Sequence, residues 1–203
     1  MTDTGNPEDV VGLYQRHADA WDRERRAELV TERAWMDRFT ASLQPGASIL
    51  DIGCGSGQPI AKHLIERGYD VTGVDSSPPL IDKCRARFPG NEWIVSDMRS
   101  LVLNRRFDAL IAWDSFFHLS YEHQRAMFPI FEQHANPGAP LLFTTGPDHG
   151  IAMGSYQGEP LYHASLSPAE YRELLARHGF RVIAHTTEDP DCGRHTVWLA
   201  QCL

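Results

Sequence analysis

A glycine-rich stretch carries the strongest chemical signal in the sequence. The apolar residues 49–52 lead directly into a turn in which Gly53, Gly55 and Gly57 alternate with other residues. Glycine allows positive φ angles and lets a ligand approach the main chain closely, and the start of a following helix offers unpaired N–H groups. The pattern predicts a turn that binds a small molecule through its backbone. The alternative is a tight structural turn without a ligand.

Asp75 is the second signal, because it ends the apolar residues 71–74 shortly after the glycine-rich turn. In a doubly wound sheet, the carboxylate at the end of the second strand can accept hydrogen bonds from both hydroxyls of a ribose. The alternative is that Asp75 caps a helix beginning near Pro78. Together with the turn, Asp75 predicts a nucleoside-containing cofactor.

The glycine spacing separates two classes of such cofactor. Nicotinamide binding favours Gly-x-Gly-x-x-Gly, but Gln58 stands where the third glycine would be. A carboxylate at Asp51, just before the turn, also disfavours a pyrophosphate at the helix N-terminus and suits a cofactor that carries an ammonium group. A nicotinamide-dependent oxidoreductase is therefore the less favoured alternative.

The elements around these residues alternate between strands and helices, which predicts an α/β fold with a largely parallel sheet. The spacing of apolar residues in the first 45 residues predicts helix. The turn at 189–193 is too short for a parallel crossover, so the last strand should run antiparallel. The expected strands cover residues 48–52, 70–74, 92–95, 107–112, 140–144, 181–187 and 195–202, and the later helices cover 58–66, 79–88, 121–134 and 167–178.

Composition excludes several function classes. The formal net charge of −8 disfavours nucleic acid and anionic membrane surfaces as partners. No stretch approaches the roughly 18 apolar residues of a membrane span, and the first nine residues show no signal-peptide pattern. Cys54, Cys84, Cys192 and Cys202 are scattered, so no metal site is expected. We expect a cytoplasmic protein, either a monomer or a homodimer.

The segment 51–57 resembles the acidic-x-Gly-x-Gly-x-Gly motif of the class I S-adenosylmethionine-dependent methyltransferases, in particular the small-molecule branch with an N-terminal helical cap. The resemblance covers about residue 10 to residue 203 and includes the Gly179-Phe180 pair. It implies a Rossmann-like doubly wound sheet of seven strands in the order 3-2-1-4-5-7-6, with the last strand antiparallel. The implied cofactor is S-adenosylmethionine, with S-adenosylhomocysteine as product and no metal.

The same resemblance implies roles for individual residues. Asp51 would lie near the amino group of the cofactor, Asp75 on the ribose, Asp97 at the adenine amino group and Met98 against the adenine ring. Tyr14 and Trp21 would help to close the pocket, or else simply pack on the sheet domain. The implied cofactor contacts are Tyr14, Trp21, Asp51, Gly53, Cys54, Gly55, Gly57, Asp75, Ser76, Asp97, Met98 and Trp113.

Methyl transfer from a sulfonium is an in-line displacement that chiefly requires a held nucleophile and excluded water. The acceptor atom, whether oxygen, nitrogen or sulfur, is undetermined. If a general base exists, His118 and Asp114 are the candidates, because both follow the fourth strand near the switch point of the sheet. Alternatively, His118 forms part of the pocket wall and Asp114 orients its loop.

Two regions complete the predicted enzyme. Residues 1–45 form the helical cap, and residues 46–203 form the cofactor-binding domain. Within that domain, residues 146–167 read as a long loop without periodicity, and such loops are usually functional or disordered. We predict a substrate lid here, with Tyr156, Tyr162 and His163 as substrate-binding residues. The predicted function is methyl transfer to a small metabolite; the alternative is a binding module without turnover.

Overall fold

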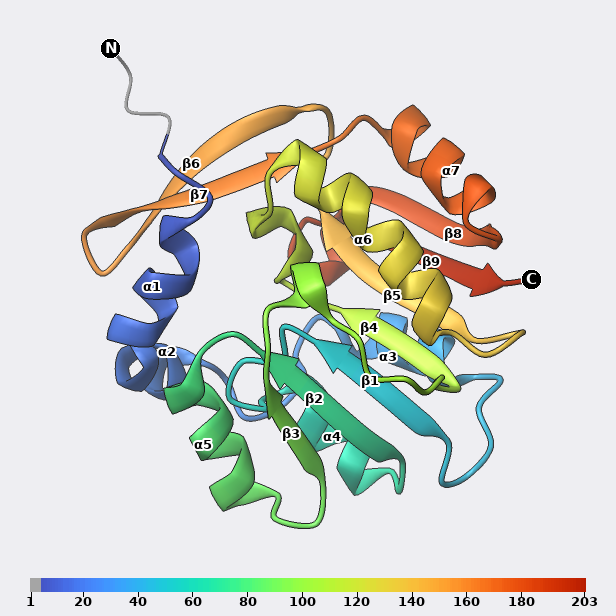
Figure 1. Cartoon of the computed structure of the whole chain (residues 1–203), viewed down its shortest axis with the longest axis horizontal. Coiled ribbons are helices and arrows are strands. Elements are labelled where there is room, and N and C mark those ends of the chain that lie inside the picture. The colour runs from blue at the N-terminus through green and yellow to red at the C-terminus, as the bar shows by residue number, and fades with distance from the viewer. Residues whose placement is uncertain (1–4) are drawn as a thin grey trace.

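The computed structural model describes residues 5–203, so residues 1–4 of the predicted cap lie outside the described residues. Seven strands form one sheet in the order β3-β2-β1-β4-β5-β9-β8. β9 runs antiparallel to both of its neighbours, and the pairs among β1 to β5 are parallel. The predicted strand order is confirmed, with β8 and β9 as the sixth and seventh strands of this sheet (Figure 1). The sheet strands are β1 (Ser48–Ile52), β2 (Asp70–Asp75), β3 (Glu92–Val95), β4 (Ala109–Ala112), β5 (Pro140–Thr145), β8 (Phe180–Asp189) and β9 (His195–Cys202).

Two apolar layers cover the sheet because its side chains alternate between the faces. On one face, Leu50 and Leu110 pack under α6 and α7; on the other, Ile49 and Ile111 pack under α3, α4 and α5. Figure 1 shows α6 and α7 in front of the sheet and α3 and α4 behind it. These helices are α3 (Arg33–Thr40), α4 (Ile60–Glu66), α5 (Pro78–Arg87), α6 (Tyr121–His134) and α7 (Pro168–Arg177).

The starts of α6 and α7 follow from their capping residues. The hydroxyl of Ser120 accepts a hydrogen bond from the backbone N–H of His123 at the start of α6, and Ser167 does the same with Glu170 at the start of α7. Such caps satisfy N–H groups that have no partner inside the helix. Pro168 occupies the first turn of α7, where its missing N–H is no loss.

The N-terminal region forms short helices rather than one long helix. α1 (Asp9–Arg16), α2 (Ala18–Glu24) and α3 follow one another with breaks between them. In Figure 1, α1 and α2 lie beside the ends of the parallel strands, apart from the layers that cover the sheet. The predicted cap therefore consists of α1 and α2, whereas α3 belongs to the covering layer.

The prediction of a loop over residues 146–167 is wrong. β6 (Gly150–Tyr156) and β7 (Glu159–Ser165) form an antiparallel two-stranded sheet of their own. β7 packs against α1 through a small cluster that includes Val10, Leu13, Leu161 and Tyr162. β6 is exposed along its middle, which explains why apolar periodicity gives little sign of a strand there.

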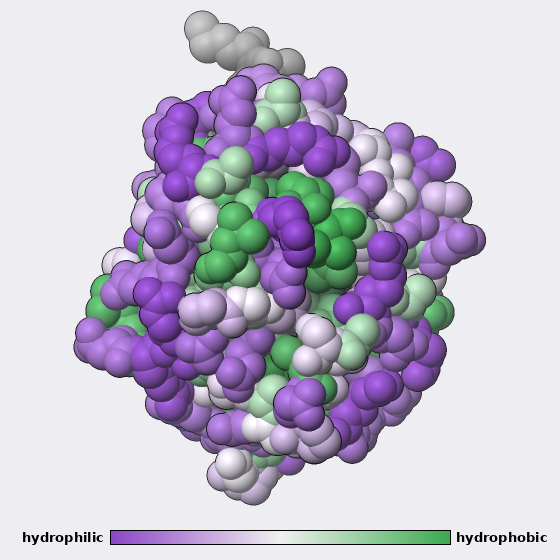
Figure 2. Space-filling view, turned by 90° about the vertical axis from the view of Figure 1, so that its right-hand side faces the viewer, coloured by the Kyte–Doolittle hydropathy of each residue, from purple (hydrophilic) through white to green (hydrophobic). Residues whose placement is uncertain are grey.

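Figure 2 shows the side of the molecule where the C-terminus emerges. This face carries the amino ends of the parallel strands, since Pro140 at the start of β5 pairs with Gln201 near the end of β9. Its surface is mostly hydrophilic, with a group of apolar side chains above the middle and smaller apolar patches elsewhere. The polar residues singled out from the sequence lie at the opposite edge of the sheet.

Candidate active site at the carboxyl ends of the parallel strands

A pocket opens at the carboxyl ends of β1 to β4, beneath α1 and α2. It encloses about 800 Å³ of empty space, counted to its open mouth, which falls in the range of small-ligand sites. In an open α/β sheet this edge is where ligands bind. Its wall includes the following predicted residues: Tyr14, Trp21, Gly53, Gly55, Asp75, Ser76, Asp97, Met98, Asp114 and His118.

The glycine-rich turn has the geometry that its sequence predicts. Gly53, Gly55 and Gly57 have φ angles of 79°, 56° and 77°, which disfavour other residues. A Cβ atom on Gly53 would lie 2.2 Å from the Cβ of Ser115, whose hydroxyl donates to the carbonyl of Ile52. Gly57 instead faces Cys84 and Phe88, so its position serves packing.

Asp75 ties this turn to the end of β2. One carboxylate oxygen accepts the backbone N–H of Gly55 and the other accepts that of Ser77, both at 2.9 Å. Burial raises the pKa of Asp75, although these hydrogen bonds oppose the rise. A carboxylate has about four lone-pair sites, so each oxygen retains room for one more donor, as a ribose diol would supply.

Asp51 lies under a second, smaller hollow beside the pocket. Its side chain makes no hydrogen bond or ion pair with another described residue, and only 3% of the residue is exposed. Burial, followed by the negative charge of Asp75, raises the pKa of Asp51 to about 7. A buried carboxyl without a partner is stabilised when a cation approaches, so this position fits an ammonium group. Cys54 and Trp113 also line the hollow.

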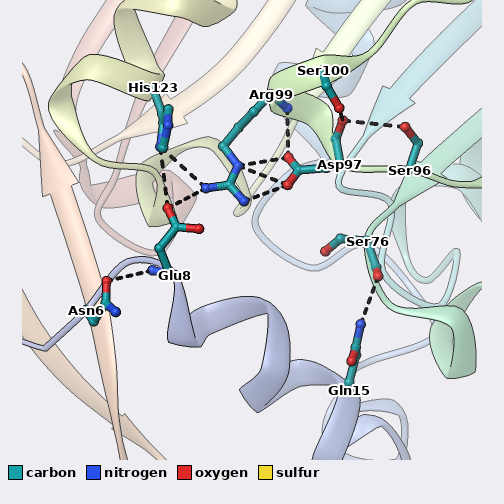
Figure 3. A network of polar contacts seen from close by, with 9 residues as sticks. All are labelled: Asn6, Glu8, Gln15, Ser76, Ser96, Asp97, Arg99, Ser100 and His123. Atoms are coloured by element: carbon teal, nitrogen blue, oxygen red, sulfur yellow. Dashed lines mark hydrogen bonds and ion pairs between the residues drawn. The ribbon is translucent and has the colours of Figure 1, made fainter.

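A polar network closes the other end of the pocket, at Asp97 (Figure 3). The guanidinium of Arg99 donates to both oxygens of Asp97, from Nε to Oδ1 at 3.0 Å and from Nη2 to Oδ2 at 2.6 Å. Arg99 also bridges to Glu8 at the start of α1, next to His123. Burial alone would raise the pKa of Asp97, but the contact with Arg99 lowers this pKa overall. Asp97 reaches the pocket as predicted, already paired with a cation.

His118 meets Tyr14 across the pocket wall. The hydroxyl of Tyr14 lies 3.0 Å from Nε2 of His118, and Nδ1 lies 2.9 Å from the carbonyl oxygen of Tyr162. A carbonyl can only accept, so Nδ1 carries the proton and Nε2 accepts the hydrogen bond of the Tyr14 hydroxyl. Burial lowers the pKa of His118 to about 4, which keeps the ring neutral near pH 7.

Asp114 has a different environment from the one expected of a base. It takes a positive φ of 51° at the end of β4. Its two carboxylate oxygens face His195 at 3.0 Å and Arg25 at 3.4 Å. Burial would raise the pKa of Asp114, but these two cations lower it overall. A carboxylate held between cations is poorly suited to take up a proton.

The predicted substrate residues stand behind His118 and Tyr14 rather than in the pocket wall. The ring centroid of Tyr156 lies 6.2 Å from that of Tyr14 and 5.6 Å from that of Trp21. The ring of His163 lies 4.8 Å from that of His118, and Tyr162 contributes its carbonyl. The hairpin therefore supports the cap, and substrate contact by these three residues remains a prediction.

Sequence reasoning missed Glu8, Arg25, Arg99 and His195. Glu8, Arg25 and His195 lie far along the chain from their partners, so no local spacing could indicate these contacts. Arg99 carries a weak signal, because it follows Asp97 by two residues at the end of a predicted strand.

The described residues contain no cluster of three or more side chains suited to hold a metal ion. Among the same residues, none of the helices combines the length and the apolar character needed to cross a bilayer.

Comparisons with known proteins agree with this geometry. A family model described as a methyltransferase domain matches residues 49–138. An O-methyltransferase from Pyrenophora dematioidea is 28% identical over 207 residues, which cover 86% of this chain and 76% of that protein. A malonyl-(acyl-carrier protein) O-methyltransferase from Serratia marcescens is 30% identical over 163 residues, covering 76% of this chain and 57% of that protein.

The fold is also shared with solved structures. The glycopeptide N-methyltransferase MtfA, solved in complex with S-adenosylmethionine, superimposes with a TM-score of 0.70 at 16% identity, over 89% of this chain and 96% of that chain. At this identity the likeness shows the fold. The matching family model and the turn at 51–57 identify residues 49–138 as a methyltransferase domain of the class I S-adenosylmethionine-dependent type.

Proposed function

We propose that this protein transfers a methyl group from S-adenosylmethionine to a small-molecule acceptor. The observation that carries the proposal is the set of groups at one edge of the sheet. They are the glycine-rich turn, the carboxylate of Asp75, which has room for the hydroxyls of a ribose, and the buried carboxyl of Asp51, which has no partner among the described residues. These groups match a nucleoside that carries an amino-acid ammonium. The two sequence relatives named above are O-methyltransferases, and the structural relative MtfA is an N-methyltransferase. The acceptor atom therefore stays open between oxygen and nitrogen.

A small acceptor fits the enclosure of the site. α1 and α2 cover the pocket, and the β6–β7 hairpin packs behind α1. Such a roof excludes water and limits the size of the acceptor. The acidic chain also disfavours nucleic acid as a substrate. The four cysteines are free and buried, which suits a reducing compartment such as the cytoplasm.

Bound S-adenosylmethionine supplies a methyl group that its positive sulfur already activates for in-line displacement. The chain then has to hold the nucleophile, and His118 is placed to do so. Its Nε2 is unprotonated and holds the Tyr14 hydroxyl at 3.0 Å. An acceptor O–H or N–H that takes the place of this hydroxyl would be oriented by the same lone pair. With a pKa of about 4, His118 acts as an orienting hydrogen-bond acceptor more than as a strong base.

The test is release of S-adenosylhomocysteine when the purified protein is incubated with S-adenosylmethionine and a panel of small hydroxyl- and amine-bearing metabolites. Asp75→Ala serves as the control with impaired binding, because losing a hydrogen bond to a charged group costs about 1.5–3 kcal/mol. We expect turnover with at least one acceptor and a large loss in the variant. Calorimetric binding of S-adenosylhomocysteine without turnover across the panel would favour the alternative of a binding module.

A further inference from the structure

The edge of β7 that faces away from β6 contacts the loop that carries His118. In an antiparallel pair, every second residue directs its backbone groups away from the partner strand, and Tyr162 and Ala164 are two residues apart on β7. The carbonyl of Tyr162 accepts a hydrogen bond from Nδ1 of His118 at 2.9 Å. The carbonyl of Ala164 accepts one from Nε2 of Gln124 at 2.8 Å. β7 therefore meets both the residue proposed to orient the acceptor and a residue of α6.

Gln124 is fully buried on α6, and both N–H groups of its amide have acceptors. Nε2 donates to the carbonyl of Leu119 at 3.0 Å as well as to that of Ala164. Oε1 accepts from the hydroxyl of Tyr171 at 2.6 Å, and this hydroxyl accepts the backbone N–H of Leu166 at 3.0 Å. Because the two carbonyls can only accept, the amide nitrogen must face them and the amide oxygen must face Tyr171.

These hydrogen bonds connect the backbone on both sides of the contact between His118 and Tyr162. Leu119 directly follows His118, and Ala164 follows Tyr162 by two residues. The amide of Gln124 bridges the two carbonyls, so it holds the loop and the strand at the separation at which Nδ1 of His118 reaches its acceptor. Gln124 and Ala164 are both buried, and a buried carbonyl that loses its donor is costly. The spacing between loop and strand therefore depends on this one amide.

We propose that Gln124 is a positioning residue for methyl transfer, which holds the Tyr162 carbonyl against Nδ1 of His118 and thereby keeps the Nε2 lone pair toward the pocket. Which nitrogen of a neutral histidine carries the proton is set by the hydrogen bond that the other nitrogen makes. Without an acceptor at Nδ1, the proton can occupy Nε2, which then accepts no hydrogen bond from the methyl acceptor. Gln124 lines neither the pocket nor the smaller hollow, so it acts through His118. The inference rests on the proposed role of His118 in orienting the acceptor.

The protonation site of His118 can be measured without cofactor or turnover. In protein labelled with ¹⁵N at histidine, the chemical shifts of the ring nitrogens distinguish the two neutral tautomers, and His118→Gln identifies the signals of His118. We expect the Nδ1–H form in the wild type at neutral pH. Gln124→Met keeps a side chain of similar length but has no donor, so we expect a substantial population of the Nε2–H form. Gln133→Met is the matched control, because Gln133 is exposed on the same helix.

Catalysis gives a second readout, with an acceptor that supports turnover. Gln124→Met should lower kcat roughly two- to ten-fold, as expected for the loss of one neutral hydrogen bond to the acceptor, and should leave the affinity for S-adenosylhomocysteine unchanged. Tyr171→Phe removes the hydroxyl that orients the Gln124 amide and keeps the ring, so it should shift the tautomer in the same direction by a smaller amount. Thermal unfolding shows whether each variant retains its fold.

A merely structural role for Gln124 would lower the thermal midpoint of Gln124→Met but leave His118 in its Nδ1–H form. That result in a folded variant would overturn the proposal, as would an equal change of tautomer in Gln133→Met. If Gln124→Met does not fold, the tautomer in Tyr171→Phe decides. Absence of turnover in the wild type would contradict the proposed function, whereas the tautomer measurement would still decide whether Gln124 positions His118.

Discussion

Three aspartates at the carboxyl ends of parallel strands have different chemistry because their partners differ. Asp75 accepts hydrogen bonds from two backbone N–H groups, and Asp114 lies between two cations. Asp51 has no hydrogen bond and no ion pair with another described residue. The sequence indicates that carboxylates stand at these strand ends, since a strand and a turn are local features. It does not indicate their charge, because Arg25 and His195 arrive from distant segments. The role of each carboxylate therefore becomes readable only in the folded chain.

Cofactor affinity should depend on pH through Asp51. In the ligand-free protein its pKa is about 7, and a bound ammonium favours the ionised form. As pH falls below about 7, the carboxyl gains a proton and the affinity for S-adenosylhomocysteine falls, by up to roughly ten-fold per pH unit. Well above pH 7, where Asp51 is already ionised, it should cause no further change in the affinity for S-adenosylhomocysteine.

Calorimetry at about pH 6 in buffers of different ionisation enthalpy should detect release of up to about one proton per bound cofactor. Asp51→Asn should bind more weakly near neutral pH and show no such release. A wild-type protein whose affinity stays flat from about pH 8 to about pH 6 would contradict the raised pKa.

At the scale of elements, the strand–turn–helix unit was predictable and the β6–β7 hairpin was not. β1 is a short apolar run followed by glycines, and each step has a local cause. β6 is exposed over its middle and contains two glycines, so it has neither the alternation nor the apolar run that indicates a strand. Its pairing with β7 and the packing of β7 on α1 hold it in place, and these are tertiary causes.

Gly55→Val tests the turn itself. Valine resists the φ of 56°, and its Cβ would lie 3.4 Å from Nε1 of Trp21. We expect loss of measurable S-adenosylhomocysteine binding with the circular dichroism spectrum retained. Cofactor affinity equal to that of the wild type would show that the turn serves structure alone.

Glu159 connects the β6–β7 hairpin to the cap through ion-pair contacts with Arg16 and with His17. Glu159→Gln removes the charge and preserves the shape, so we expect faster proteolytic cleavage within α1 and the hairpin, and protection by S-adenosylhomocysteine. Because exposed ion pairs contribute little to global stability, the thermal midpoint should barely move. Glu173→Gln, an exposed residue on α7, is the control; equal cleavage rates in both variants would argue against a fastened cap.

At the scale of the whole molecule, the fold class followed from the sequence pattern and the strand order from the family resemblance, whereas the breaks in the cap followed from neither. Alternating elements and a short final turn leave few topologies for the sheet. The division into α1, α2 and α3 depends on what each helix packs against: α1 contacts β7, and α3 covers the sheet. The spacing of apolar residues indicates that a helix has a buried face, but it does not indicate which element packs against that face.

Acid stability of the molecule should depend on His118. Its pKa is about 4 in the folded protein, against 6.5 for an unperturbed histidine. Between these values the unfolded chain binds a proton that the folded protein does not, so stability is fully present above pH 6.5 and falls as the pH drops toward 4. The whole contribution is on the order of 3 kcal/mol.

Urea denaturation of wild type and His118→Gln over this range measures the effect. The variant should lose less stability between pH 6.5 and 4 than the wild type does. The pH dependence of stability that His195 contributes has the opposite sign. Asp114 raises the pKa of His195 to about 11, so the stability contributed by His195 is lost only as the pH rises above 6.5. Parallel pH curves for wild type and variant would reject the role of His118.

The reversed direction of β9 links the pocket to a distant edge of the sheet. β8 pairs with the sheet only through β9, and β9 begins with His195, the residue that holds Asp114. Opening of β9 would therefore release the edge strand and the cation beside Asp114 in a single cooperative event, as expected of a local unfolding unit. A ligand bound against Asp114 should slow amide hydrogen exchange in β8, a strand that lines neither hollow of the site. Exchange measurements with and without S-adenosylhomocysteine should show the slowing only when the ligand is present.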